Sequence, residues 1–75
     1  MMIAELIDGD DFRQRLTALG IHIPEGASPD TCARLARRCR AEGEVPGLDE
    51  LLRELEEKRE VLLPSVRTAL ETHLR

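Results

Sequence analysis

Residues 32–57 read CARLARRCRAEGEVPGLDELLRELEE, and this stretch decides both the fold and the charge pattern of the chain. Small or apolar residues recur at positions i, i+3, i+4 and i+7 on each side of Gly43, which is the spacing of one face of an α-helix. Within this stretch, four arginines lie before Gly43, and five acids lie after Gly47 with only Arg53 to offset them. These charged residues are Arg34, Arg37, Arg38, Arg40, Asp49, Glu50, Glu54, Glu56 and Glu57.

Helix boundaries can be assigned on both sides of this stretch. Ser28-Pro29-Asp30 predicts a helix start, with serine as the cap, proline at the first helical position and an acid in the first turn. Gly43 predicts the end of that helix. Pro64 suits the start of a last helix better than a helix interior.

The N-terminal region predicts a further helical element. Apolar residues have helical spacing within residues 2–8, and Gly9 either bends the element or splits it there. Asp8 or Asp10 can cap the second piece. Gly20 is expected to close it.

The whole chain predicts one all-α domain over residues 1–75. No segment of useful length alternates with a period of two, so no strands are expected. Four or five helices with tight connections predict a compact antiparallel bundle. The last helix has no stop signal before Arg75, as in a domain excised from a longer polypeptide.

Composition excludes several classes of function. A chain of 75 residues buries only about 60% of its unfolded surface and has little room for a deep cleft, so no small-molecule substrate is expected. The net charge of −4 argues against general nucleic-acid binding, which needs a basic excess. No apolar run approaches 18 residues, so no membrane span is expected. A cytoplasmic location is predicted.

No metal, cofactor or catalytic site is expected. Cys32 and Cys39 would be separated by about 10 Å of helical rise, which is too far for a disulfide, so both are interpreted as reduced core thiols. Neither they nor His22 and His73 have the local spacing of zinc ligands. Ser28 begins a helix and has no adjacent base, so the chain is interpreted as non-enzymatic.

The charge division allows two interpretations, which the sequence leaves open. The arginines of one helix can face the acids of the next within one molecule, where exposed pairs contribute about 0–1 kcal/mol each. Alternatively, the two charged surfaces can bind unlike surfaces of another copy of the chain or of a sister helical domain. Such heterologous contacts do not close as a dimer and propagate instead.

The helix order and the element Gly47-Leu48-Asp49-Glu50-Leu51-Leu52 resemble death-fold-like adaptor domains. In particular, residues 3–74 resemble bacterial effector-associated domains and caspase-recruitment-like domains, including the closing LLPSVRTALETHL. The resemblance implies a death-fold-like bundle of up to six helices. It also implies homotypic, charge-complementary contacts that recruit or activate an effector in bacterial anti-phage or conflict systems.

Three other functions have partial support in the sequence. The arginines could contact nucleic-acid phosphates, although the chain has no Trp or Tyr to stack on bases. A carrier or docking domain of a multi-enzyme system would be modified at Ser28, but the acyl-carrier Asp-Ser-Leu motif is missing there. A helical subunit could bind a dedicated partner through the run Val61, Leu62 and Leu63, of which at least one is expected to be exposed without such a partner.

Overall fold

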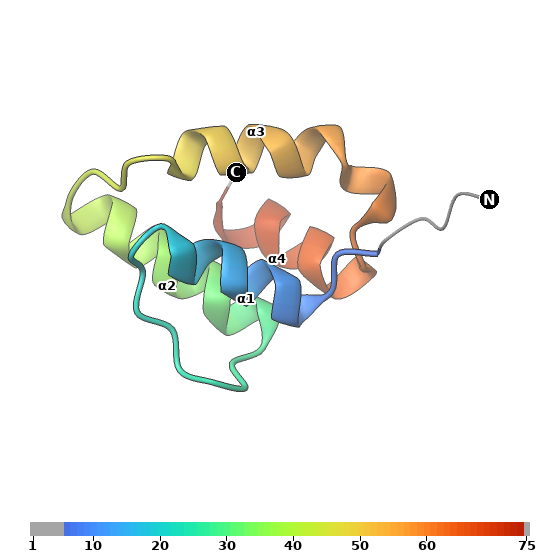
Figure 1. The fold of residues 1–75 in the computed structure, drawn as a ribbon, viewed down its shortest axis with the longest axis horizontal. Helices are drawn as coiled ribbons and strands as arrows, with labels where there is room; N and C mark the ends of the chain where they lie inside the picture. The colour runs from blue at the N-terminus through green and yellow to red at the C-terminus, as the bar shows by residue number, and fades with distance from the viewer. Residues whose placement is uncertain (1–5, 75) are drawn as a thin grey trace.

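The computed structural model describes residues 6–74, and over this range it consists of helices and connecting segments (Figure 1). The prediction of an all-α fold without strands is confirmed for this range. None of its helices is both long and apolar enough to cross a membrane. The α-helices are α1 (Gly9–Ala18), α2 (Pro29–Glu42), α3 (Leu48–Glu57) and α4 (Pro64–His73), and a short 3₁₀ helix, η1 (Arg59–Val61), lies between α3 and α4.

The predicted helix starts are confirmed by their caps. The Ser28 side chain accepts a hydrogen bond from the Thr31 backbone N–H at 3.2 Å, and Pro29 is the first residue of α2. Of the two aspartates considered for α1, Asp8 is the cap, because its Oδ1 accepts from the Asp11 backbone N–H at 2.9 Å. Each bond satisfies a backbone N–H that has no partner within its own helix.

The helix expected over residues 2–8 is wrong at residues 6–8, and its first part lies outside the described residues. Ile7 is extended and forms a parallel bridge with Leu62. Its N–H donates to the Val61 carbonyl at 2.8 Å, and its carbonyl accepts from the Leu63 N–H at 3.1 Å. Helical spacing cannot reveal this bridge, because Leu62 is more than fifty residues away in the sequence.

Gly9 does not break a helix but begins α1. A β-carbon at this position would lie 2.9 Å from Cγ of Pro29, which is closer than such atoms approach in proteins. The missing side chain therefore allows the first turn of α1 to lie against the first turn of α2.

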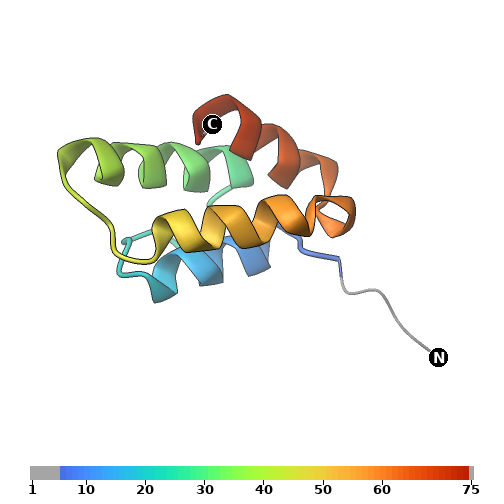
Figure 2. The same ribbon diagram turned by 90° about the horizontal axis from the view of Figure 1, so that it is seen from above.

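The predicted antiparallel order applies only to α3. In the two perpendicular views α1, α2 and α4 run in one sense and α3 runs in the other (Figures 1 and 2). The connection over residues 19–28 explains why α1 and α2 run in the same direction. About ten extended residues can span roughly 33 Å, whereas the ten residues of α1 rise only about 15 Å, so the chain can return before α2 begins.

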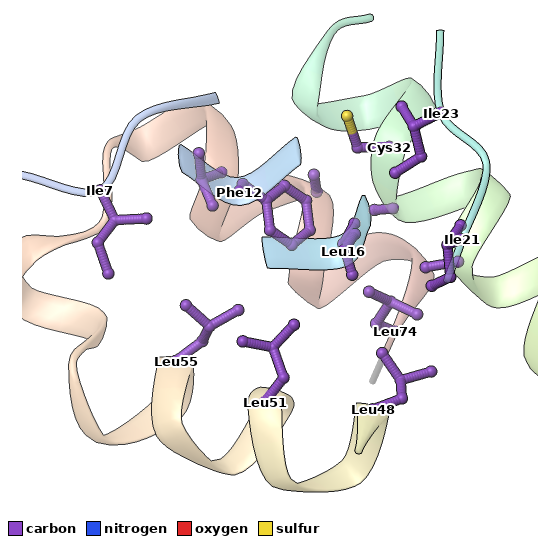
Figure 3. Packing of buried hydrophobic residues seen from close by; sticks show 14 of the residues in the cluster. Ile7, Phe12, Leu16, Ile21, Ile23, Cys32, Leu48, Leu51, Leu55 and Leu74 are labelled. Atoms are coloured by element: carbon purple, nitrogen blue, oxygen red, sulfur yellow. The ribbon is translucent and has the colours of Figure 1, made fainter. Parts of the chain in front are cut away.

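One apolar cluster fills the space between the helices. Phe12 and Leu16 of α1 lie opposite Leu51 and Leu55 of α3, and Cys32 of α2 closes another side (Figure 3). All five side chains are buried.

The expected exposure within residues 61–63 is wrong. Leu62 is buried, and Val61 and Leu63 are partly buried against the cluster. The turn of η1 followed by the extended bridge to Ile7 places these consecutive apolar residues against the bundle. This run therefore gives no evidence of an exposed leucine surface.

Candidate interaction surface

The basic surface is formed by the four arginines of α2, all of which are exposed. Arg34 donates to Asp30 at 2.8 Å, and Arg38 donates to Glu42 at 3.2 Å. Both pairs lie within α2 at a spacing of four residues. Such exposed pairs stabilise a helix by only about 0.3–0.5 kcal/mol, so water and other molecules can compete for these guanidinium groups.

Arg37 and Arg40 differ from the other two. No ion pair or side-chain hydrogen bond within residues 6–74 includes either side chain. Arg40 borders a hollow at the corner between α2 and α3 together with Asp49 and Glu50. Nevertheless, no ion pair joins it to these acids in the described part of the chain.

The acids of α3 lie on two flanks of the helix. Glu50, Glu54 and Glu57 follow each other at spacings of four and three residues, which places them on one flank. That flank faces α1, because Glu54 pairs with Arg15 of α1 at 3.3 Å. Asp49 and Glu56 lie seven residues apart on the other side, where Glu56 borders a groove formed with α4 and pairs with Arg59.

Glu54 has two cationic partners. Lys58 and Arg15 donate to the same oxygen, Oε1, at 3.0 Å and 3.3 Å. The hydrogen bond and charge of Lys58, with a smaller contribution from Arg15, hold the pKa of the Glu54 carboxyl below its ordinary value. No hydrogen bond within residues 6–74 includes the second oxygen, Oε2.

The intramolecular pairing between α2 and α3 is not observed in residues 6–74. Arg34 and Arg38 pair within their own helix, and Glu54 pairs with α1 and with Lys58. The assignment of the nine charged residues to a surface for another molecule remains a prediction. The arginines of α2 and the acids of α3 are both accessible to water.

His73 is a residue whose contact was not anticipated from the sequence. Its Nε2 lies 2.7 Å from Oδ1 of Asp30, and the pair joins the last turn of α4 to the first turn of α2. A carboxylate only accepts, so the imidazole nitrogen is the donor. The bond from His73 first, and that from Arg34 second, hold the pKa of Asp30 below its ordinary value of 3.8.

We expect Asp30→Asn to lower the melting temperature near neutral pH. Because the pKa of Asp30 is depressed in the folded state, its stabilising effect is present above pH 3.8 and is lost as the pH falls through the folded value. The difference in melting temperature between wild type and variant should therefore shrink in acid. Thermal unfolding followed by circular dichroism at several pH values measures it.

Asp49→Asn is the matched control for this measurement. Asp49 occupies the same position in the first turn of α3 as Asp30 does in α2, but no ion pair within residues 6–74 includes it. Both variants lose the same helix-dipole interaction. Equal effects of the two variants at every pH would contradict a role of the His73 and Arg34 contacts.

The two cysteines and Ser28 have structural roles in α2 or just before it. Cys32 is buried and Cys39 is partly buried on α2, and both are free, as the sequence predicted. Burial raises the pKa of the Cys32 thiol. The Ser28 hydroxyl donates to Thr31 Oγ1 at 3.0 Å in addition to capping α2.

Comparisons of the chain with protein-family models, with curated proteins and with solved structures give no significant match.

Proposed function

We propose that this chain is a non-enzymatic, cytoplasmic interaction module that binds another copy of itself, or a sister helical domain, through surfaces of unlike charge. In this role it would act as an adaptor that recruits or activates an effector. The death-fold resemblance suggests bacterial anti-phage or conflict defence as the setting. The observation that carries the proposal is that Arg37 and Arg40 on α2, and Glu50 and Glu57 on α3, are exposed and have no ion-pair partner within residues 6–74.

Simple electrostatics supports contact between unlike surfaces. Complementary charged surfaces accelerate association and reject partners of like charge. A copy presenting α2 therefore attracts the acidic helix of another copy and repels its basic helix. Because exposed charges are screened over about 8 Å at physiological ionic strength, the association is expected to weaken with salt.

The combined variant Arg37→Glu and Arg40→Glu should weaken self-association strongly. Sedimentation velocity across a salt series measures the effect, and circular dichroism verifies that the helices remain. A second variant, Glu50→Arg with Glu57→Arg, should bind the first one, because the charges are exchanged between the two surfaces. Wild-type protein that remains monomeric at low salt would refute binding between copies of the chain.

Arg67→Glu is the matched control for the arginine variants. Arg67 is an exposed arginine on α4 and lies outside both charged surfaces. The substitution Arg67→Glu changes the net charge by the same amount as Arg37→Glu or Arg40→Glu. If it reduced self-association as much as a single α2 substitution, net charge rather than a defined surface would explain the result.

A further inference from the structure

A shallow groove runs between the C-terminal end of α1 and the N-terminal half of α3. Ala18 is exposed and Leu19 is partly buried, while Leu51 is buried at its base. Its lining consists of an apolar floor and a charged rim. The lining residues with side chains are Ala18, Leu19, Leu51, Arg15, Glu50 and Glu54, and Gly47 completes the lining.

The rim of the groove has unused hydrogen-bond acceptors. Glu50 has no ion-pair partner within residues 6–74, and both bonds to Glu54 use one oxygen only. Glu57 continues the same flank one turn further along α3. A cationic side chain can therefore reach free carboxylate oxygens directly above an apolar surface.

We propose that this groove receives the exposed arginines of α2 from a second copy of the chain. The inference rests on the proposed function and names its receiving surface. The two arginines, Arg37 and Arg40, are three residues apart on α2. The two acids, Glu50 and Glu54, are four residues apart on α3. The side chains of each pair therefore begin about 5–6 Å from each other, so the spacings of the two pairs match. The aliphatic stems of the arginines would cover Ala18 and Leu19, while the guanidinium groups bind the carboxylates.

The positions of the two surfaces determine how copies would assemble. Arg37 lies two turns from Asp30 on the same face of α2, and Asp30 contacts His73 of α4. The groove instead lies against α1. Viewed from above, α2 and α4 lie on one side of α3 and α1 lies on the other (Figure 2). Contact between these different surfaces is heterologous, so it leaves a free surface at each end of a pair.

Two variants with complementary defects test the groove. One variant carries Ala18→Arg, which fills the groove, and Glu50→Arg, which reverses the charge at its rim. The other variant carries Arg37→Glu and Arg40→Glu. In sedimentation velocity at low salt, each alone should self-associate at least about tenfold more weakly than wild type. Mixed together, they retain one intact groove and one intact arginine pair. They should form a complex of two 8.5 kDa chains that grows no further.

Glu71→Arg is the matched control for the charge change in the groove. Glu71 is an exposed acid on α4 that lies outside the groove and outside the nine charged residues, so the wild-type level of self-association is expected. Glu50→Gln provides a variant with minimal structural change and should also weaken association. Wild-type self-association combined with equal effects of Glu71→Arg and Glu50→Arg would overturn the groove but not the proposed function. A monomeric wild type would overturn both the groove and the proposed binding between copies of the chain.

Discussion

Phe12→Ala should leave the fold only marginally stable at room temperature. Phe12 is the single aromatic residue, it is fully buried, and its ring lies between α1 and the leucines of α3 (Figure 3). Truncation of a buried phenylalanine costs about 3–5 kcal/mol through lost burial and the cavity left behind. The free energy of unfolding of small domains begins at about 5 kcal/mol, so little stability would remain.

Urea unfolding followed by circular dichroism measures the effect of Phe12→Ala. Phe12→Leu is the control, because it retains most of the volume and should cost less than about 1.5 kcal/mol. The order wild type, Phe12→Leu, Phe12→Ala is expected in the unfolding midpoint. A Phe12→Ala protein with a cooperative transition close to that of wild type would show that α1 is not anchored by this ring.

Local sequence signals predicted the helices well where the determining contacts are local. The Ser28 cap, Pro29 and Gly43 define α2 correctly, and Pro64 begins α4. These residues act on the backbone within one turn, so a single segment contains the whole cause. The error at residues 6–8 has the opposite origin, because Ile7 is held by backbone hydrogen bonds to Val61 and Leu63.

The contacts of the candidate surface also divide into local ones, which the sequence indicates, and long-range ones, which it does not. The spacing of four residues allows the pairs Arg34–Asp30, Arg38–Glu42 and Lys58–Glu54 to be recognised from sequence. The contacts of His73 with Asp30 and of Arg15 with Glu54 join residues about forty positions apart, and only the packing of the helices brings them together. The groove between α1 and α3 depends on that packing as well.

Tertiary contacts must supply most of the stability of α3. Its cap residue, Gly47, makes no side-chain capping bond. A ten-residue helix is marginal in water on its own. Leu48, Leu51 and Leu55 are the buried residues of this helix, and they point toward α1 and the end of α4 (Figure 3). These leucines therefore position the acidic residues as well as completing the core.

Leu55→Ala is accordingly expected to destabilise the fold by about 2–5 kcal/mol, the range for truncating a buried leucine. Leu52→Ala is the matched control on the same helix, since Leu52 is only partly buried and should cost less. Urea unfolding compares the two free energies, and sedimentation velocity compares their self-association. Because α3 carries the acids of the proposed interface, Leu55→Ala should reduce self-association without altering any charge. Equal stability losses from the two substitutions would contradict the view that the buried face of α3 holds this helix in place.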